Sequence, residues 1–211
     1  MEAILPLVLS VIIAYVIGAI PTAYIFGRLL KGIDIRQHGS GNVGATNAFR
    51  ILGKGPGTVV LIIDIIKGVV PTTLVANTFG LTDPLMLVVL GLIAVAGHNW
   101  TVFLNFKGGK GIATTLGVLI GLTIQIPGIR PVLLGTLGVW LVLFLVFGYV
   151  SLASIVASVA LPILMVAFNA PFVIKLMSII LCLFIVFRHR TNIHRLIKGQ
   201  EHRVKFSFHK K

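Results

Sequence analysis

The chain has 211 residues, of which 57% are hydrophobic and only 11% are charged, and its mean hydropathy is +1.06. A soluble domain of this size cannot hide so much apolar sequence in its core, so the composition predicts an integral membrane protein. The formal net charge is +13 with only five acidic residues, which indicates membrane topology, anionic lipid headgroups or anionic substrates as its cause. Nucleic acid is disfavoured as a partner, because the aromatic residues lie within or at the ends of apolar runs.

Apolar runs separated by turn-forming residues follow one another along the whole chain. They cover residues 4–27, 57–77, 84–103, 112–126, 131–149, 151–168 and 171–187. Because a membrane span needs about 20 residues, we expect an all-α integral membrane protein with about seven transmembrane helices, and six as the alternative count. No repeat at a fixed period and no low-complexity tract interrupts these runs, so residues 1–211 are predicted to form a single transmembrane helical domain.

The basic residues predict the orientation of the chain in the membrane. With seven helices, 15 of the 18 lysines and arginines fall on one side, in the 28–56 loop, the 104–111 loop and the tail after residue 187. Lys175 is expected to reach the opposite side. Because loops rich in lysine and arginine stay in the cytoplasm, the amino terminus is predicted to be outside and the carboxyl terminus cytoplasmic.

The first polar segment covers residues 39–50 and begins GSGNVGATN. Its first six residues match the G-x-G-x-x-G pattern of dinucleotide-binding folds, but no strand precedes them, so that interpretation is rejected. Short hydrogen-bonding side chains alternate here with glycines. Arg50 follows, and its guanidinium can donate two charge-assisted hydrogen bonds to a phosphate. The segment therefore predicts a phosphate-binding loop, formed by Ser40, Gly41, Asn42, Gly44, Thr46, Asn47 and Arg50.

The second segment covers residues 97–115 and reads GHNWTVFLNFKGGKGIATT. Glycines let a backbone turn its N–H groups toward one point, and the helix that follows adds the positive end of its dipole. Phosphate is the natural ligand of such a loop, which is formed by Lys107, Gly108, Gly109, Lys110 and Gly111. It is not a Walker A loop, because the spacing differs and no strand precedes it. The alternative is a Gly-rich turn with lysines that serve topology alone.

The third segment covers residues 188–201 and reads RHRTNIHRLIKGQE. Helical spacing places Arg188, Asn192 and Arg195 on one face, with His189 beside it. A basic helix at the membrane surface is the alternative, but lipid headgroups require neither the asparagine nor the histidine. We expect Glu201 to hold its basic neighbours. All three segments are predicted on the same side, where they could meet at one pocket.

Two ionisable residues lie inside the second apolar run. Asp64 and Lys67 are three positions apart, which predicts a paired intramembrane ion couple, and such residues are functional candidates by default. Their role stays open at this point. His98, near the end of the third run, is either a helix-end hydrogen bonder or a catalyst.

The shortage of acids limits the chemistry. The carboxylates are too few for a metal-dependent alcohol phosphotransferase, and no Ser-His-Asp arrangement is available. The H-x-x-x-x-D pair of many acyl-CoA-dependent glycerolipid acyltransferases is absent, since Phe103 stands at that distance from His98. We predict neither a metal nor a cofactor, and the single cysteine, Cys182, offers no disulfide.

Together the three segments resemble the three signature motifs of the bacterial acyl-phosphate:glycerol-3-phosphate acyltransferases, which are seven-helix inner-membrane enzymes. The first motif, GSGNxGATN, is complete at residues 39–47, and the Gly-Gly-Lys-Gly core of the second stands at 108–111. The third motif is present as His189, Asn192, Ile193, Arg195, Leu196, Gly199 and Glu201.

The resemblance implies that the sn-1 hydroxyl of glycerol 3-phosphate attacks the carbonyl of a long-chain acyl phosphate, giving lysophosphatidic acid and inorganic phosphate. It implies catalytic roles for Ser40, Arg50, Lys110, His189 and Asn192. It implies substrate binding by Gly41, Asn42, Gly44, Thr46, Asn47, Lys107, Gly108, Gly109, Gly111, Arg188 and Arg195. The proton acceptor is either His189 or a substrate phosphate.

The resemblance also implies a multi-pass protein of the bacterial inner membrane, in contact with membrane lipid and supplied by an enzyme that forms acyl phosphate. A transporter or exchanger of organic phosphates is the alternative function, since it also needs a basic, glycine-lined site. That alternative predicts a site at the midplane between inverted halves, and neither feature is visible in the sequence.

Overall fold

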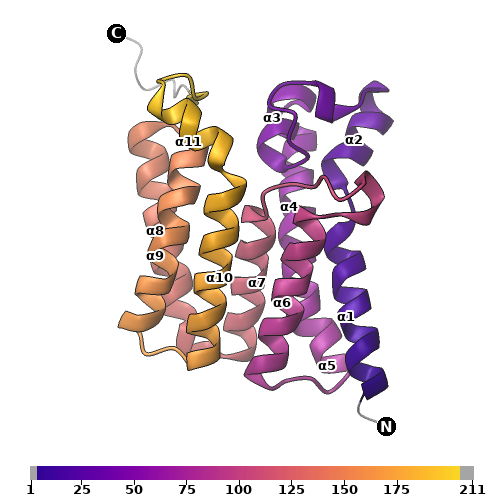
Figure 1. Cartoon of the computed structure of the whole chain (residues 1–211), viewed down its shortest axis with the longest axis vertical. Coiled ribbons are helices and arrows are strands. Elements are labelled where there is room, and N and C mark those ends of the chain that lie inside the picture. Colours follow the sequence, from indigo (N-terminus) through magenta and orange to yellow (C-terminus); the bar gives the residue numbers. More distant parts are fainter. Residues whose placement is uncertain (1–3, 205–211) are drawn as a thin grey trace. The chain divides into compact units, whose positions relative to one another are not determined.

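The computed structural model describes residues 4–204, and these residues form helices and the loops between them (Figure 1). The chain divides into two compact units, Met1–Pro127 and Gly128–Lys211, which we call unit 1 and unit 2 and describe separately. The single domain expected from the sequence stays a prediction. Lys205, Lys210 and Lys211, which contribute to the predicted orientation, lie outside the described residues.

Unit 1 contains long helices that run along the unit and short ones at its two ends. The α-helices are α1 (Ile4–Ala19), α2 (Thr22–Lys31), α3 (Ala45–Leu52), α4 (Lys54–Val70), α5 (Ala76–Thr78), α6 (Pro84–Asn99) and α7 (Ile112–Gln125). Shorter helical turns are η1 (Ile35–Gln37), the π-helical turn η2 (Pro71–Val75) and η3 (Val102–Leu104). Within this unit, α2 and α3 lie at the end opposite the start of α1, and α5 lies at the other end (Figure 1).

The long helices of unit 1 pack closely through small residues. α1 packs along α6, and α4 packs along α7. A Cβ atom at Gly117 on α7 would overlap the carbonyl oxygen of Ile65 on α4, and one at Gly18 would overlap that of Ala94 on α6. Only glycine permits these approaches, as is typical of helix pairs in membranes, where small residues let backbones come together.

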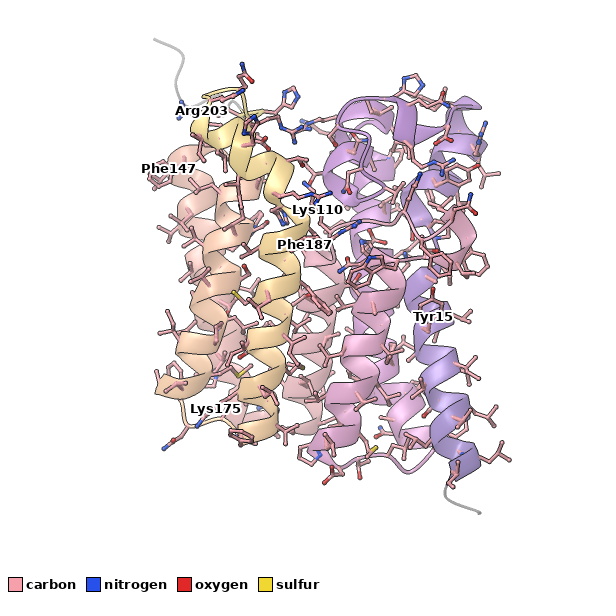
Figure 2. The ribbon with its side chains drawn as sticks, viewed as in Figure 1. Tyr15, Lys110, Phe147, Lys175, Phe187 and Arg203 are labelled. Atoms are coloured by element: carbon pink, nitrogen blue, oxygen red, sulfur yellow. The ribbon has the colours of Figure 1, made fainter. Side chains whose placement is uncertain are left out.

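Unit 2 is a bundle of three long helices followed by a short one. After the turn η4 (Pro127–Ile129), which spans the division between the units, come α8 (Arg130–Phe147), α9 (Val150–Ala167), α10 (Phe172–Arg188) and α11 (Arg190–Ile197). α9 packs against both α8 and α10, and α11 also contacts α9. Lys175, near the start of α10, lies at the opposite end of this unit from Arg203 (Figure 2). This agrees with the prediction that Lys175 is on the side away from the basic tail.

The structure gives a range for the number of membrane spans, and the upper end of this range equals the alternative count of six. By length and composition, four helical segments of the described residues can cross a membrane, and six can if each of two bent helix pairs counts as one span. The segment expected at 112–126 is a helix of 14 residues, shorter than the roughly 20 that a span needs. The count of seven and the orientation of the termini stay predictions.

Neither of the two bends was expected from the sequence. The pair of α1 and α2 was expected as one helix over the apolar run 4–27, and the bend between α10 and α11 falls in the segment expected as one basic helix. α1 and α2 meet at an angle of 41°, and α10 and α11 at 59°. The first bend lies at Pro21, whose ring supplies no backbone N–H and clashes with a straight helix. The expected first helix, 4–27, is therefore two helices.

The side chains of α8 show that the apolar runs face an apolar surrounding. Leu134, Val142, Leu145 and Val146 are each more than half exposed. A soluble protein rarely exposes such a continuous apolar surface. These side chains agree with an integral membrane protein.

Candidate active site

The first motif forms the loop between η1 and α3 in unit 1. Gly39 and Gly41 both have φ in the left-handed region, at 61° and 71°, which permits the tight turn around Ser40. α3 begins directly after Gly44, so Thr46 and Arg50 lie one helical turn apart on α3. The loop thereby presents Ser40 and Asn42 ahead of the amino-terminal end of a helix, where backbone N–H groups favour anions.

Asn47 holds this loop in shape. Its Oδ1 accepts a hydrogen bond from the backbone N–H of Ser40 at 3.0 Å, and its Nδ2 donates to the carbonyl of His38 at 3.0 Å and to that of Ile35 at 3.3 Å. The side chain is fully buried. The predicted contact of Asn47 with substrate stays a prediction. In the structure, its side-chain amide holds the backbone of Ser40 in place.

An ion pair stabilises the approach to the loop. Arg36 donates to both carboxylate oxygens of Asp34, with its closest nitrogen at 2.6 Å, and the Asp34 carboxylate also accepts from the Arg36 backbone N–H. The hydrogen bonds from the Arg36 side chain lower the pKa of Asp34 to about 2, against the opposing effect of burial. Asp34 is therefore an ionised structural group at neutral pH.

The second motif folds back over the end of α6. The N–H of Gly108 donates to the carbonyl of Asn99 at 3.1 Å, and that of Gly109 donates to the carbonyl of His98 at 3.0 Å. Gly111 has φ of 78° and is the residue from which α7 begins. Lys110 therefore stands immediately before a helix amino terminus, on the loop between α6 and α7 (Figure 2).

The structure brings the first two motifs together at one end of unit 1. A hydrophobic cluster contains Ile35 on η1, Val43 from the first loop and Leu104 on η3, in the segment that leads to the second loop. Ala48 and Leu52 on α3 and Val60 on α4 complete its contacts with the flanking helices. Two loops more than 50 residues apart in sequence thus share one buried core, which places their glycine- and lysine-rich stretches in the same part of the unit.

α1 fixes the start of the second loop. The hydroxyl of Tyr15 donates to the carbonyl of Trp100 at 2.7 Å, and the hydroxyl of Thr101 donates to the carbonyl of Ala19 (Figure 2 labels Tyr15). These hydrogen bonds cross more than 80 residues of sequence. Thr101 lies within the predicted second segment, 97–115, but no local signal in the sequence identifies Tyr15 as part of this region.

The predicted ion pair between Asp64 and Lys67 is confirmed, and its depth in the membrane stays a prediction. Lys67 Nζ lies 2.6 Å from Asp64 Oδ1, and both side chains are only 2% exposed. Lys67 also donates to the carbonyl of Ile20, where α1 ends. His98 Nδ1 lies 4.0 Å from the same oxygen of Asp64.

The third motif lies in unit 2, at the bend between α10 and α11. His189 occupies the bend and is buried, with its Nδ1 at 2.8 Å from the carbonyl oxygen of Ile185. A carbonyl only accepts, so Nδ1 carries the proton and Nε2 is the acceptor when the ring is neutral. The bend also interrupts the helical face expected for this motif, since Arg188 ends α10 whereas Asn192 and Arg195 belong to α11.

Glu201 holds the third motif, as the sequence predicted. Its carboxylate accepts from Asn192 Nδ2 at 2.7 Å, from Arg195 Nε at 2.8 Å and from the hydroxyl of Ser151 at 2.9 Å. Burial favours a higher pKa for Glu201, but the hydrogen bonds from Arg195, Asn192 and Ser151 outweigh it and lower the pKa. Glu201 therefore attaches α11 to the start of α9.

Gly109 gives a direct test of the second loop. A Cβ atom there would overlap Nε2 of His98, so Gly109→Ala must displace the loop or the histidine. We expect kcat/KM for glycerol 3-phosphate to fall by about 10- to 100-fold, because small displacements of binding groups are costly. The measurement is steady-state phosphate release.

Gly55→Ala is the matched control for this substitution. Gly55 lies in the first turn of α4 in the same unit, and no atom lies within 4 Å of a Cβ placed there. Its activity should stay within about twofold of the original chain, since an open helical site tolerates alanine. Equal losses in the two variants would contradict a specific role of the loop.

Comparison with known proteins gives one consistent result. Residues 8–199 match the family model described as glycerol-3-phosphate acyltransferase. The glycerol-3-phosphate acyltransferase of Parasynechococcus marenigrum is 44% identical over 201 residues, which cover 95% of this chain and 91% of that protein. Glycerol-3-phosphate acyltransferase 2 of Moorella thermoacetica is 42% identical, with 93% of this chain and 96% of that protein covered.

Solved structures are similar in fold as well as in sequence. The structure resembles that of PlsY, an integral membrane glycerol 3-phosphate acyltransferase, in its glycerol 3-phosphate form, with a TM-score of 0.85 and 42% identity. The similarity covers 94% of this chain and 96% of that one. The lysophosphatidic acid form of PlsY matches with a TM-score of 0.82 and 41% identity, over 94% of this chain and 95% of that one.

Proposed function

Because the chain belongs to the glycerol-3-phosphate acyltransferase family and is an acyltransferase, we propose that it transfers a fatty acyl group from acyl phosphate to the sn-1 hydroxyl of glycerol 3-phosphate. The products are lysophosphatidic acid and inorganic phosphate. The observation that carries the proposal is the hydrophobic cluster joining the two Gly-rich loops in unit 1. It brings Val43 of the first loop and Leu104, which lies shortly before the second loop, into one core, and this supports a shared phosphate site.

The reaction forms an ester bond and breaks an acyl–phosphate bond. The hydroxyl oxygen of glycerol 3-phosphate attacks the acyl carbonyl carbon, phosphate leaves with the bonding electron pair, and the hydroxyl proton passes to a phosphate oxygen. Phosphate is a good leaving group, so positioning and anion stabilisation can carry much of the catalysis. The scarcity of acidic residues agrees with this mechanism.

We assign the loops to the phosphate groups of the two substrates. The loop of Gly108, Gly109, Lys110 and Gly111 contributes backbone N–H groups, a lysine and the start of α7, which together favour a dianion. Ser40 supplies a hydroxyl, and Arg50 a planar guanidinium suited to two-pronged phosphate contact. The proposed binding set also contains Gly41, Asn42, Gly44, Thr46, Asn47, Lys107, Arg188 and Arg195.

His189 and Asn192 are proposed to orient the reacting groups, with a substrate phosphate as the proton acceptor. The hydrogen bond from His189 Nδ1 to the carbonyl of Ile185 and the bond from Asn192 to Glu201 support this role, since both fix the direction of their side chains. The acceptor Nε2 also makes His189 the rival general base, as a near-neutral reference pKa suits an imidazole to that task.

His189→Gln separates the two roles of this residue. An orienting role predicts that kcat falls by about 10- to 100-fold, while a general base contributes about 100- to 10,000-fold. The readouts are kcat from phosphate release and the Kd of glycerol 3-phosphate from calorimetry. Near-total loss of turnover with an unchanged Kd would favour histidine as the base and contradict proton transfer to the substrate phosphate.

We further propose that the protein is a multi-pass enzyme of the bacterial inner membrane, with its motif segments on the cytoplasmic side. Both substrates then arrive from the cytoplasm or from the cytoplasmic leaflet, and an enzyme that forms acyl phosphate must supply the donor. α2 and α3, whose sequences contain Arg28, Lys31 and Arg50, lie at the end of unit 1 opposite the start of α1 (Figure 1), which supports this orientation.

One assay tests the proposed reaction. Purified protein in detergent is given acyl phosphate with and without glycerol 3-phosphate, and both free phosphate and lysophosphatidic acid are measured. Phosphate release that requires glycerol 3-phosphate and matches the lysophosphatidic acid formed is the expected result. No release, combined with glycerol 3-phosphate uptake into vesicles that contain the protein, would instead establish the transporter alternative.

A further inference from the structure

Asp64, Lys67 and His98 lie beneath the second loop and have no place in the proposed contacts with substrate. We infer that they position this loop, so that the buried ion pair sets the affinity for glycerol 3-phosphate through Gly108, Gly109 and Lys110. The inference rests on the proposed function of the loop as a phosphate site. It makes the three residues positioning groups, which act through the loop and do not touch the reacting atoms.

A buried ion pair needs a reason to be present. Transfer of two charges out of water costs several kcal/mol for each ion, and apolar residues of similar volume often fill such a place with equal or better stability. In unit 1, Asp64 and Lys67 are almost completely buried, and the second oxygen of Asp64, Oδ2, is buried without a hydrogen-bond partner in residues 4–204. Stability alone gives a weak account of the pair.

The pair connects α4 with the end of α1. Lys67 donates both to Asp64 and to the carbonyl of Ile20. The neighbouring carbonyl of Ala19 accepts from Thr101, which lies just after α6. The last residues of α1 thus receive hydrogen bonds from the lysine of the pair and from the segment that leads into the second loop.

His98 connects the pair with the loop itself. Its Nδ1 faces Asp64 Oδ1 at 4.0 Å, and its backbone carbonyl accepts from the N–H of Gly109 at 3.0 Å. The opposite edge of the ring, at Nε2, packs against Gly109 so closely that a Cβ atom would not fit. A shift of the ring therefore moves the loop, since no side chain lies between them to absorb the change.

The contacts thus run from the charged side chains of Lys67 and Asp64 through His98 to Gly109, the residue before Lys110. Removing the charges should let the ring and the loop relax, so that Lys110 and the backbone N–H groups meet the phosphate less well. The expected consequence is a higher KM for glycerol 3-phosphate with little change in kcat, because the chemistry at the acyl carbonyl is untouched. Loss of groups that orient a binding shell typically costs 10- to 100-fold in affinity or activity.

The test compares three variants of the full chain in detergent. Asp64→Asn removes one charge, and Asp64→Asn with Lys67→Met removes both. Thr72→Val is the matched control, since Thr72 is also fully buried, in η2 directly after α4, and its hydroxyl donates to the carbonyls of Gly68 and Val69 on α4. For each variant, KM and kcat for glycerol 3-phosphate, its Kd from calorimetry and the Tm are measured.

The single variant leaves Lys67 without its counter-charge and should lower Tm as well as affinity. The double variant contains no uncompensated charge, so Tm should return close to that of the original chain. KM and Kd should nevertheless stay about tenfold higher, with kcat within about threefold. Thr72→Val should change Tm without a change in KM or Kd.

Two results would overturn the inference. If KM and Kd return to the original values together with Tm in the double variant, the pair serves stability alone. If kcat collapses at saturating glycerol 3-phosphate while Kd is unchanged, the pair takes part in the chemistry. The Kd measurement also separates this inference from the proposed function. If the original chain binds glycerol 3-phosphate but does not turn it over, only the proposed reaction is contradicted. If it does not bind glycerol 3-phosphate, the proposed reaction and this inference are both contradicted.

Discussion

Lys110→Ala should lower kcat/KM for glycerol 3-phosphate by about 100- to 1,000-fold. A charge-assisted contact to a desolvated anion is worth about 2–5 kcal/mol when one partner is truncated, and each 1.36 kcal/mol corresponds to a factor of ten. Lys110 is half-buried and stands between two glycines directly before α7, so its immediate neighbours have no side chain to take its place. Steady-state phosphate release at varied glycerol 3-phosphate measures the loss.

Lys54→Ala provides the matched control for Lys110→Ala. Lys54 is an exposed lysine at the first residue of α4 in the same unit and has no proposed substrate contact. Removal of its charge alters the net charge by the same amount, so a general electrostatic effect would appear in both variants. We expect less than a threefold change for Lys54→Ala, since isolated surface charges contribute little. Similar losses in the two variants would show that net charge, and not a phosphate contact, decides the activity.

Glu201→Gln should destabilise unit 2 and lower its unfolding free energy by about 2–3 kcal/mol. The carboxylate accepts from three donors on Ser151, Asn192 and Arg195. A glutamine at this place turns one acceptor oxygen into a donor that faces another donor, and an unsatisfied buried polar group costs about 1–3 kcal/mol. The partial exposure of Arg195 limits the effect. The readout is thermal unfolding in detergent, with kcat measured in parallel because Asn192 loses its partner.

The pH dependence of unfolding gives a second measure of the Glu201 contacts. The pKa of Glu201 in the folded chain lies below its ordinary value of 4.5, so its stabilisation is complete above that value and is lost as the pH falls through the folded pKa. The original chain should therefore lose stability on acidification more steeply than Glu201→Gln.

Asp83→Asn is the control for Glu201→Gln. Asp83 is an exposed acid whose side chain accepts from the N–H of Leu85 at the start of α6. Asparagine caps a helix about as well as aspartate, so this variant should unfold like the original chain. An equal loss of stability in both variants would contradict the role assigned to Glu201.

Short-range patterns in the sequence determined much of the chemistry of this protein. The spacing of Asp64 and Lys67 specified their ion pair, because residues three apart on a helix are neighbours in any fold that keeps the helix. The contiguous motifs 39–47 and 108–111 indicated phosphate-binding loops, since glycines and the following helix act locally. Composition was sufficient for the membrane class, and the length of the apolar runs was sufficient for the helical architecture.

The tertiary structure decided which of these local features act together. Val43 and Leu104 meet in one buried cluster, Tyr15 supports Trp100, and Ser151 binds Glu201, although each pair is separated by at least 50 residues. Such contacts depend on how whole helices pack, and apolar membrane helices carry little sequence signal for their partners, since lipid and protein present similar apolar surfaces. The bend at His189 was likewise not visible in the sequence, whereas the bend at Pro21 follows from the local geometry of proline. The sequence thus indicated the candidate phosphate-binding segments, and the packing of the helices determined what supports them.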